Sequence, residues 1–485
     1  MPEDRLVTLG QSCSEPRGAA AESPDLTGRL PDAAPRGSRA RSFGLTRTTP
    51  YNARWTGCAR GQDTEENGVS PTDVILDRMR SLIPAVSDRP GDDPIFALNA
   101  IALERARAGE SIVNATLGAL MNDDGQLAIM PAVFEAYAKV DRRLASAYAP
   151  IAGDERFLGA VVDDVLAGSP MADQAAAVAT AGATGALHHA IVNFLEPGQA
   201  LYTTSYFWGP YGIIATHTGR RVETFEMFDD RGRFDVEAFE RGLEQLLREQ
   251  GRALVVLNFP CHNPTGYSLD DEEWTGIADA LLRLGRTAPV TLLIDIAYDK
   301  YGAPGKRRWV NPVASIVGTC TVLVAWTASK SFAQYGSRVG ALIGISADDE
   351  ERDRIQAALA FACRGTWSNC NHLGILGITE LLLDPVLKAS ADAQREKLKT
   401  LLGERVTVFN REAERLGLPT PRYEGGFFVA VFTPNAETTA AAAREQGVFV
   451  VPMNGAVRVA LCSTPKADVP RLVQALAHGV EAARA

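Results

Sequence analysis

A lysine with hydroxyl residues on both sides lies in the second half of the sequence. Lys330 belongs to Trp-Thr-Ala-Ser-Lys-Ser-Phe, residues 326–332, and Arg338 follows eight residues later. A lysine at the end of a buried strand can form an imine, while neighbouring hydroxyls and a guanidinium can hold a phosphate. Thr327 and Ser329 are the hydroxyl residues in question. An exposed loop lysine is the alternative for any single lysine, so other segments must support this interpretation.

Two further polar segments directly follow apolar runs. Residues 258–266, Asn-Phe-Pro-Cys-His-Asn-Pro-Thr-Gly, come after the run 253–257, and alone they could form a simple turn. Asp295 follows the run 291–294, three residues before Tyr298. A carboxylate at a buried strand end needs a partner, because an unpaired charge in a low-dielectric interior is costly. A protonated pyridine nitrogen would be such a partner.

A glycine-rich turn, Gly-Ala-Thr-Gly-Ala-Leu at 182–187, runs into a helix that we expect to start near Leu187. The amides of the turn and the N-terminus of the helix can face an anion. Such a turn says little alone, but it gains weight when other motifs follow it in order. It is therefore a second candidate contact for a phosphate.

Short apolar runs, separated by helical stretches, must position these residues. The runs rich in Val, Leu and Ile are 253–259, 291–296, 320–326 and 341–345. Such runs are typical of buried strands in a mostly parallel sheet. Further strands are predicted at 427–432, 448–451 and 457–461, with a helical stretch around 438–446. The pattern predicts an α/β fold with a smaller α/β domain closing the chain.

Composition excludes several classes of protein. The 485 residues, 46% of them hydrophobic, suffice for two domains with sizeable cores. A net charge of −10 argues against nucleic-acid and anionic membrane partners, because those surfaces attract an excess of Lys and Arg. The seven cysteines are scattered, without pairs or clusters at metal spacing, so we expect reduced thiols, a cytoplasmic location and no metal. No apolar run approaches the roughly 18 residues that cross a bilayer.

Residues 1–70 differ from the rest of the chain. They are rich in Pro, Gly, Ser, Ala and Arg and show neither helical nor strand periodicity. Such a composition cannot bury enough apolar surface to fold alone, so we expect a disordered tail. A transit peptide is disfavoured because Glu3 and Asp4 lie at its start.

The order and strand-end placement of the motifs resemble those of fold-type I pyridoxal 5′-phosphate (PLP) enzymes, specifically the class I aminotransferases of the aspartate and aromatic amino-acid group. The resemblance extends from about residue 90 to the C-terminus. It implies a large PLP-binding domain, with a mostly parallel central sheet, over residues 146–375. A smaller α/β domain formed by both chain ends would comprise residues 71–145 and 376–485.

The resemblance implies a role for each matched residue. Lys330 resembles the catalytic lysine that forms a Schiff base with the cofactor, and Asp295 the acid that pairs with its pyridine nitrogen. Tyr298 and Asn263 resemble the pair that bonds the 3′ oxygen of the ring. Trp208 matches the aromatic residue stacked on the cofactor, with a core tryptophan as the alternative. The residues matching the phosphate ligands are Ala183, Thr184, Thr327, Ser329, Arg338 and Tyr148.

The same resemblance implies a substrate site and a homodimer. Tyr148 matches a tyrosine lent to the phosphate site of the neighbouring subunit. Arg458 matches the arginine that binds the substrate carboxylate, and a salt-bridged strand arginine is the alternative. Arg364 matches an arginine that reaches from the neighbouring subunit to a distal carboxylate, and a helix-terminal cation is the alternative. The other substrate contacts implied are Gly118, in the segment that closes over the substrate, Asn263 and Trp208.

The function implied is transfer of the amino group of an L-amino acid, dicarboxylic or aromatic, to a 2-oxo acid such as 2-oxoglutarate by a ping-pong mechanism. C–S β-lyases, cyclopropane-forming synthases and decarboxylases share the fold and stay open as alternatives. A PLP domain can also act as a ligand sensor in a transcription regulator. The tail shows no helix-turn-helix pattern and the net charge is wrong for DNA, which disfavours that alternative.

Three positions depart from the pattern of the aspartate aminotransferases. Gly182 stands where those enzymes place a phosphate-binding serine, and Tyr211 stands where they place a histidine behind the pyridine-bound aspartate. Cys261 and His262 lie inside the Asn-Pro-Thr-Gly motif with no role assigned. PLP binding is compatible with all three departures.

Overall fold

The computed structural model describes residues 81–83, 86–87, 89–91, 93–302 and 307–485. The predicted tail, residues 1–70, lies outside the described residues. The chain divides into two units, Met1–Ser87 and Asp88–Ala485. All strands of the described chain belong to the second unit.

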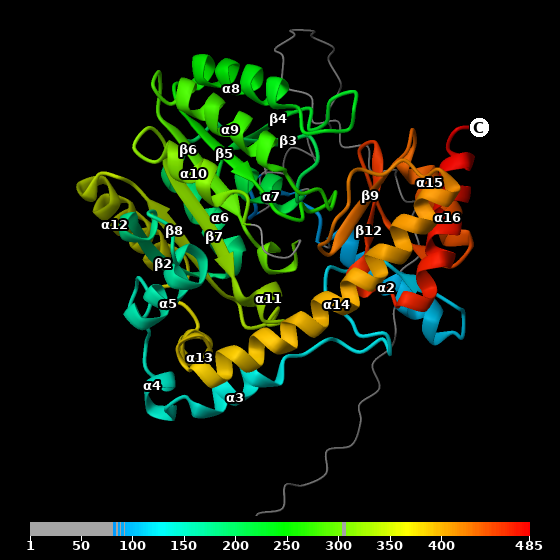
Figure 1. The fold of residues 1–485 in the computed structure, drawn as a ribbon, viewed down its shortest axis with the longest axis horizontal. Coiled ribbons are helices and arrows are strands. Elements are labelled where there is room, and N and C mark those ends of the chain that lie inside the picture. Colours follow the sequence, from blue (N-terminus) through cyan, green and yellow to red (C-terminus); the bar gives the residue numbers. More distant parts are fainter. Residues whose placement is uncertain (1–80, 84–85, 88, 92, 303–306) are drawn as a thin grey trace, which may run out of the picture. The chain divides into compact units, whose positions relative to one another are not determined.

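A seven-stranded sheet forms the centre of this unit (Figure 1), in the order β2-β8-β7-β6-β5-β3-β4. Its strands are β2 (Ala175–Ala181), β3 (Ala200–Thr204), β4 (Arg221–Phe225), β5 (Ala253–Leu257), β6 (Val290–Asp295), β7 (Thr321–Thr327) and β8 (Val339–Ile345). All neighbours are parallel except β8, which runs antiparallel to β2 and β7. The connection from β7 to β8 is too short for the long crossover that a parallel pair requires. The predicted mostly parallel α/β sheet is confirmed.

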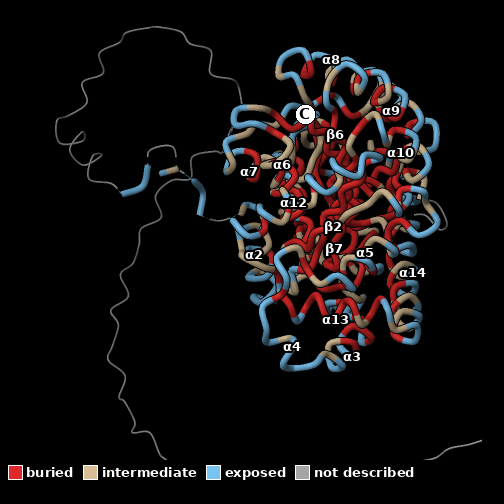
Figure 2. The backbone as a smooth tube through the Cα atoms, turned by 90° about the vertical axis from the view of Figure 1, so that its left-hand side faces the viewer, coloured by how far each residue is buried: buried red, intermediate tan, exposed pale blue. Residues whose placement is uncertain are grey.

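Helices cover this sheet, and every residue of β5, β6 and β8 is buried. Figure 2 shows the buried backbone gathered in the interior around β2, β6 and β7. Helix α6 (Gly182–Phe194) packs across β2, β5, β6, β7 and β8. It begins at Gly182 rather than near Leu187, so the predicted helix start was wrong. Gly182 has a φ of +68°, which a glycine adopts without steric cost, and the chain turns there from β2 directly into the helix.

The other α-helices of the described chain lie before, between and after these strands in the sequence. They are α2 (Pro94–Arg107), α3 (Pro131–Lys139), α4 (Arg142–Ser146), α5 (Glu155–Leu166), α7 (Pro210–His217), α8 (Val236–Gln250), α9 (Asp271–Leu284), α10 (Val310–Ile316), α11 (Ala328–Ser331), α12 (Asp349–Thr366), α13 (His372–Leu383), α14 (Pro385–Leu416), α15 (Ala436–Glu445) and α16 (Val469–Ala482). Within the described ranges, no helix combines the length and the apolar character needed to span a membrane.

A smaller α/β part draws on both ends of the described chain, as predicted. Strands β11 (Val451–Met453), β12 (Ala456–Ala460) and β9 (Phe428–Phe432) form an antiparallel sheet in that order. Strand β1 (Val113–Asn114) pairs in parallel with β10 (Val448–Phe449). The predicted strand 448–451 is therefore divided between two partners, β1 and β12. The domain limits 71–145, 146–375 and 376–485 stay a prediction.

The 32-residue helix α14 connects the two parts of this unit (Figure 1), where it contacts α3 and α13 at one end and α16 at the other. Arg405, on α14, is fully buried. Its guanidinium donates to the Met121 carbonyl at 2.8 Å, the Cys462 carbonyl at 2.7 Å and the Asp123 carboxylate at 2.7 Å. This side chain therefore ties α14 to segments from both ends of the chain.

Arg405→Leu should lower the free energy of unfolding by about 3 kcal/mol, because it removes the hydrogen bonds to the Met121 carbonyl and the Asp123 carboxylate and one of the two donors to the Cys462 carbonyl. Arg411→Leu is the matched control, since Arg411 is 65% exposed on the same helix and bonds Glu412. We expect a change below about 0.5 kcal/mol for the control. Urea denaturation measures both, and equal stability of the two variants would contradict the role given to Arg405.

Candidate active site

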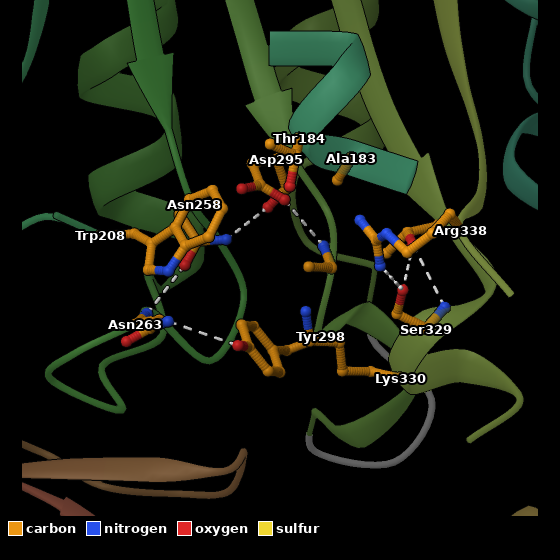
Figure 3. A pocket seen from close by; sticks show the side chains of 12 residues that line it. Ala183, Thr184, Trp208, Asn258, Asn263, Asp295, Tyr298, Ser329, Lys330 and Arg338 are labelled. Carbon is orange, nitrogen blue, oxygen red and sulfur yellow. Dashed lines mark hydrogen bonds between the residues drawn. The ribbon is translucent and has the colours of Figure 1, made fainter. Parts of the chain in front are cut away.

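A cavity of about 250 Å³ lies where several strands of the large sheet end (Figure 3). The ends of parallel strands meet at one edge of a sheet, which is where α/β folds bind ligands. The residues that line it are Ala183, Thr184, Trp208, Asn258, Asn263, Asp295, Ala297, Tyr298, Thr327, Ser329, Lys330 and Arg338. The cavity thus brings together every residue that the sequence assigned to catalysis or cofactor binding except Tyr148.

Lys330 lies on the short helix α11, directly after β7. Thr327 caps this helix, because its hydroxyl accepts a hydrogen bond from the Ser329 amide at 3.1 Å. The Lys330 amine lies over the Tyr298 ring, 5.4 Å from its centroid, and the side chain stays half-buried. Burial lowers the pKa of Lys330, and the charge of Asp295 opposes that shift. A larger fraction of the amine is therefore neutral and nucleophilic than for an exposed lysine.

Asp295 ends β6 and is 4% exposed. One carboxylate oxygen, Oδ2, accepts a hydrogen bond from the Tyr211 hydroxyl at 2.9 Å, and Oδ1 accepts one from the Ala297 amide at 3.1 Å. Burial raises the pKa of Asp295, while the Tyr211 hydrogen bond and the charge of Lys330 lower it. The ionised form thus depends on the donors around it.

Tyr298 and Asn263 form a second polar pair in the cavity. The Asn263 side-chain amide donates to the Tyr298 hydroxyl at 3.4 Å, and burial raises the pKa of that hydroxyl. Asn258 holds the loop in place, since its Oδ1 accepts from the Asn263 amide at 2.8 Å and its Nδ2 donates to the Asp295 carbonyl at 2.8 Å. Asn263 Oδ1 is buried without a hydrogen-bond partner among the described residues. A ligand donor would satisfy it.

Arg338 and the start of α6 form the cationic side of the cavity. Arg338 donates to the Ser329 hydroxyl at 3.3 Å, and Figure 3 shows these two side chains next to each other. The helix begins at Gly182, and its first turn contributes Ala183 and Thr184 to the cavity wall. A Cβ atom at Gly182 would lie 2.4 Å from Arg338 Nη2. A residue with a Cβ at this position would require the Arg338 guanidinium to shift and would have to adopt the positive φ of +68° that glycine takes without cost.

Arg458 and Gly118 lie next to the cavity, in the smaller α/β part. Arg458 is buried on β12, where it donates to the Thr116 carbonyl at 2.6 Å and lies over the Phe428 ring at 4.5 Å. Gly118 packs on the same ring, since a Cβ there would lie 2.4 Å from Phe428 Cζ. Phe428 in turn contacts the Tyr298 ring edge-on at 5.9 Å. Arg458 Nε is buried with no partner in the part of the chain described.

Tyr148 and Arg364 lie away from the cavity of their own chain. Tyr148 is 89% exposed. Arg364 is exposed in the last turn of α12 and donates to the Ser368 hydroxyl. The structure does not bring these two residues to the other predicted site residues, and their assignment to a neighbouring subunit stays a prediction.

Sequence reasoning missed Asn258 and Ala297. The resemblance put Tyr211 at the position behind the pyridine-bound aspartate, and the structure adds the hydrogen bond from its hydroxyl to Asp295. Asn258 carries the same signal as Asp295, a polar residue at the end of a buried strand, and could have been found. His262, to which the sequence assigned no role, is buried, and its Nδ1 forms a hydrogen bond with the Thr265 hydroxyl at 2.8 Å within the same loop. Burial lowers the pKa of His262 to about 3, so it is neutral.

Comparisons with known proteins agree with this geometry. A family model described as aminotransferase class I and II matches residues 111–476. The aromatic-amino-acid aminotransferase of Escherichia coli (strain K12) is 29% identical over 322 residues, 64% of this chain and 79% of that protein. The structure of an aminotransferase from Anaerococcus prevotii is similar with a TM-score of 0.80 and 30% identity, over 83% of this chain and all of that one.

An aromatic-amino-acid aminotransferase from Burkholderia pseudomallei, solved covalently bound to pyridoxal phosphate, shares the fold with a TM-score of 0.69 and 23% identity, over 83% of this chain and 100% of that one. The family model alone spans well over half of the chain. The chain therefore belongs to the class I and II aminotransferases, enzymes that transfer amino groups with the help of pyridoxal phosphate.

Proposed function

We propose that the cavity binds pyridoxal phosphate through Lys330 and transfers the amino group of a dicarboxylic or aromatic L-amino acid to a 2-oxo acid such as 2-oxoglutarate, in ping-pong fashion. One observation carries the proposal. A half-buried lysine amine shares one small cavity with a buried carboxylate, Asp295, and with a guanidinium beside a helix N-terminus, Arg338. A ligand with an aldehyde, a basic ring nitrogen and a phosphate would match these three groups.

The polar groups of the cavity fit this cofactor. Arg338, Ser329, Thr327 and the first turn of α6 would hold the phosphate, because a guanidinium, hydroxyls and free helix amides all stabilise an anion. Asp295 would hold the protonated ring nitrogen. The unpartnered Asn263 Oδ1, together with the hydroxyl of Tyr298, is available for the polar substituent of the ring. Trp208 would cover the ring face.

When bound, pyridoxal phosphate would supply an electron-accepting ring that stabilises the charge left at Cα of the substrate. Lys330 Nζ would take the proton from Cα of the amino donor as a general base and deliver it to C4′ of the cofactor as a general acid. In the second half-reaction the same amine would move a proton in the opposite direction, from C4′ to Cα of the new amino acid. Its lowered pKa favours the neutral amine that this step requires. Asp295 would keep its negative charge close to the ring nitrogen throughout. Arg458 would bind the α-carboxylate, since its Nε has no partner among the described residues.

We further propose a homodimer in which Tyr148 and Arg364 complete the site of the partner subunit. Both side chains are exposed and lie outside their own cavity. Large apolar side chains are exposed as well, among them Phe134, Phe361 and Val386. We also propose a cytoplasmic location. The five cysteines of the described residues are all free and buried, and free thiols are typical of proteins in a reducing compartment.

Dependence on an acceptor distinguishes transamination from the other reactions of the fold. Purified enzyme should convert glutamate or an aromatic amino acid only when a 2-oxo acid is present, because a ping-pong transfer stops after one half-reaction without it. Chromatography of both products measures this. Continuous turnover without any 2-oxo acid would instead indicate a lyase or a decarboxylase.

Lys330→Ala should lower turnover by at least about 1,000-fold, because one amine both anchors the cofactor and moves the proton. Borohydride reduction of the wild-type enzyme, followed by peptide mapping, should place the cofactor on Lys330. Lys300→Arg is the control, since Lys300 is a largely buried lysine paired with Asp164 at 2.8 Å outside the cavity. Labelling of any other lysine in the wild type would contradict the assignment.

Arg364→Ala tests the substrate class. If Arg364 binds the distal carboxylate of a substrate in the partner site, the fall in kcat/KM for glutamate or aspartate should correspond to a loss of about 2 to 4 kcal/mol of transition-state stabilisation. The fall for phenylalanine should be much smaller. Arg354→Ala is the matched control, because Arg354 is exposed on the same helix and pairs with Glu350. Steady-state kinetics with each donor measure the effect. An equal loss for glutamate and phenylalanine would show that Arg364 serves only the helix end.

A further inference from the structure

Tyr211 is a buried hydroxyl directly behind the cavity. It is the second residue of α7 and 1% exposed, and it does not line the cavity itself. Its hydroxyl donates to Asp295 Oδ2 at 2.9 Å. Because Asp295 forms part of the cavity wall, Tyr211 can act on a bound ligand only through that carboxylate and through its other neighbours.

The same ring also contacts two side chains of the loop that leads into α7. Trp208, which lines the cavity, meets the Tyr211 ring edge-on at 5.7 Å, and Phe207 stacks on it at 6.3 Å. The Tyr211 amide donates to the Trp208 carbonyl at 2.9 Å. One residue therefore holds both the carboxylate at one wall of the cavity and the indole at another.

The groups that face Asp295 come from several elements. They are the Tyr211 hydroxyl from α7, the Lys330 amine from α11, the Ala297 amide from the turn after β6, and the nearby Tyr298 hydroxyl. Burial, and then the charge of Asp295, raises the pKa of Tyr211 well above its ordinary value. The hydroxyl therefore keeps its proton to a higher pH than a free tyrosine. An imidazole in the same place would gain or lose a charge between about pH 5 and 8.

We propose that Tyr211 is a positioning residue that keeps the Asp295 carboxylate ionised and oriented, and the Trp208 ring in place, with a donor that stays neutral throughout the working pH range. The inference rests on the proposed function of the cavity. If the proposal holds, the net charge of the Tyr211–Asp295 pair opposite the ring nitrogen does not change with the protonation of Tyr211 in the working pH range, since a tyrosine hydroxyl cannot become a cation.

Two substitutions and a matched control test the proposal. Tyr211→Phe removes the hydroxyl alone, and Tyr211→His replaces it with a donor that titrates. Tyr202→Phe is the control, because Tyr202 is a fully buried tyrosine on β3 whose hydroxyl donates to the Phe239 carbonyl at 2.9 Å, outside the cavity. The measurements are the Kd of pyridoxal phosphate for each apoprotein, the pH titration of the absorbance of the bound cofactor, and the Tm.

Tyr211→Phe should raise the Kd by about 10- to 100-fold over that of Tyr202→Phe, as expected for a lost hydrogen bond to a charged group. The hydrogen bond from Tyr211 lowers the pKa of Asp295, so Tyr211→Phe should raise the pKa of Asp295. The absorbance change of the bound cofactor at acidic pH should then occur at a higher pH than in the wild type. Tyr211→His should recover most of the affinity and add a titration between about pH 5 and 8 that the wild type lacks.

Two results would overturn the proposal. One is a Kd and an absorbance titration for Tyr211→Phe that match those of Tyr202→Phe, and the other is a pH titration of Tyr211→His identical to the wild type. Borohydride mapping of the same wild-type samples separates this inference from the proposed function. Absence of cofactor on Lys330 would contradict the proposed function, whereas labelled Lys330 with unaffected Tyr211 variants would contradict only the role of Tyr211.

Discussion

The charge of Asp295 at the end of a buried strand is the constraint on which the site depends. Every residue of β6 is buried, so the carboxylate requires donors supplied by the protein rather than by water. Tyr211 supplies one from α7 and the Ala297 amide another, while Lys330 lies close enough for its charge to act on the carboxylate. These partners come from separate connections between strands. They meet only because the sheet order places the ends of β3, β6 and β7 at the same edge.

The cationic side of the cavity depends on a backbone constraint rather than on a charge. Gly182 and Arg338 both have left-handed backbone conformations, with φ of +68° and +53°. A Cβ at Gly340 would lie 2.5 Å from the carbonyl carbon of Gly182, so two backbone segments pack directly on each other there. A Cβ at Gly340 would collide with the backbone of Gly182 and displace the start of α6. The absence of a side chain at Gly340 therefore lets the first turn of the helix and the Arg338 guanidinium lie at the same side of the cavity.

The smaller α/β part contributes through packing on the same residues. Phe428 lies between Arg458 and Tyr298, and Gly118 lets the ring approach closely. The segment that carries Gly118 belongs to the N-terminal end of the described chain, whereas Arg458 belongs to the C-terminal end. The two residues proposed to contact the substrate, Gly118 and Arg458, thus come from opposite ends of the described chain, and the Arg405 side chain on α14 links neighbouring segments of both ends.

Much of the fold could be predicted from the sequence, because continuous apolar runs of five to seven residues at the centre of an α/β chain are stable only as buried strands. The runs at 253–259, 291–296, 320–326 and 341–345 correspond to β5, β6, β7 and β8. The residues of the cavity could be expected together, since polar groups that follow parallel strands meet at one edge. The start of α6 and the division of the strand at 448–451 could not. The start of α6 depends on the positive φ of Gly182, where β2 passes directly into the helix. The division of the strand depends on pairing with β1 and β12, which are separate segments of the chain.

The residues proposed to carry the chemistry, Lys330, Asp295, Tyr298 and Arg338, could therefore be selected from the sequence as residue types at or near strand ends. The tertiary structure alone decided which groups set their properties. Tyr211 and Asp295 are 84 residues apart, and no local pattern shows that the hydroxyl of one points at the carboxylate of the other. The pKa of a buried group is set by the donors and charges within a few ångströms of it, and those neighbours are chosen by packing rather than by position along the chain.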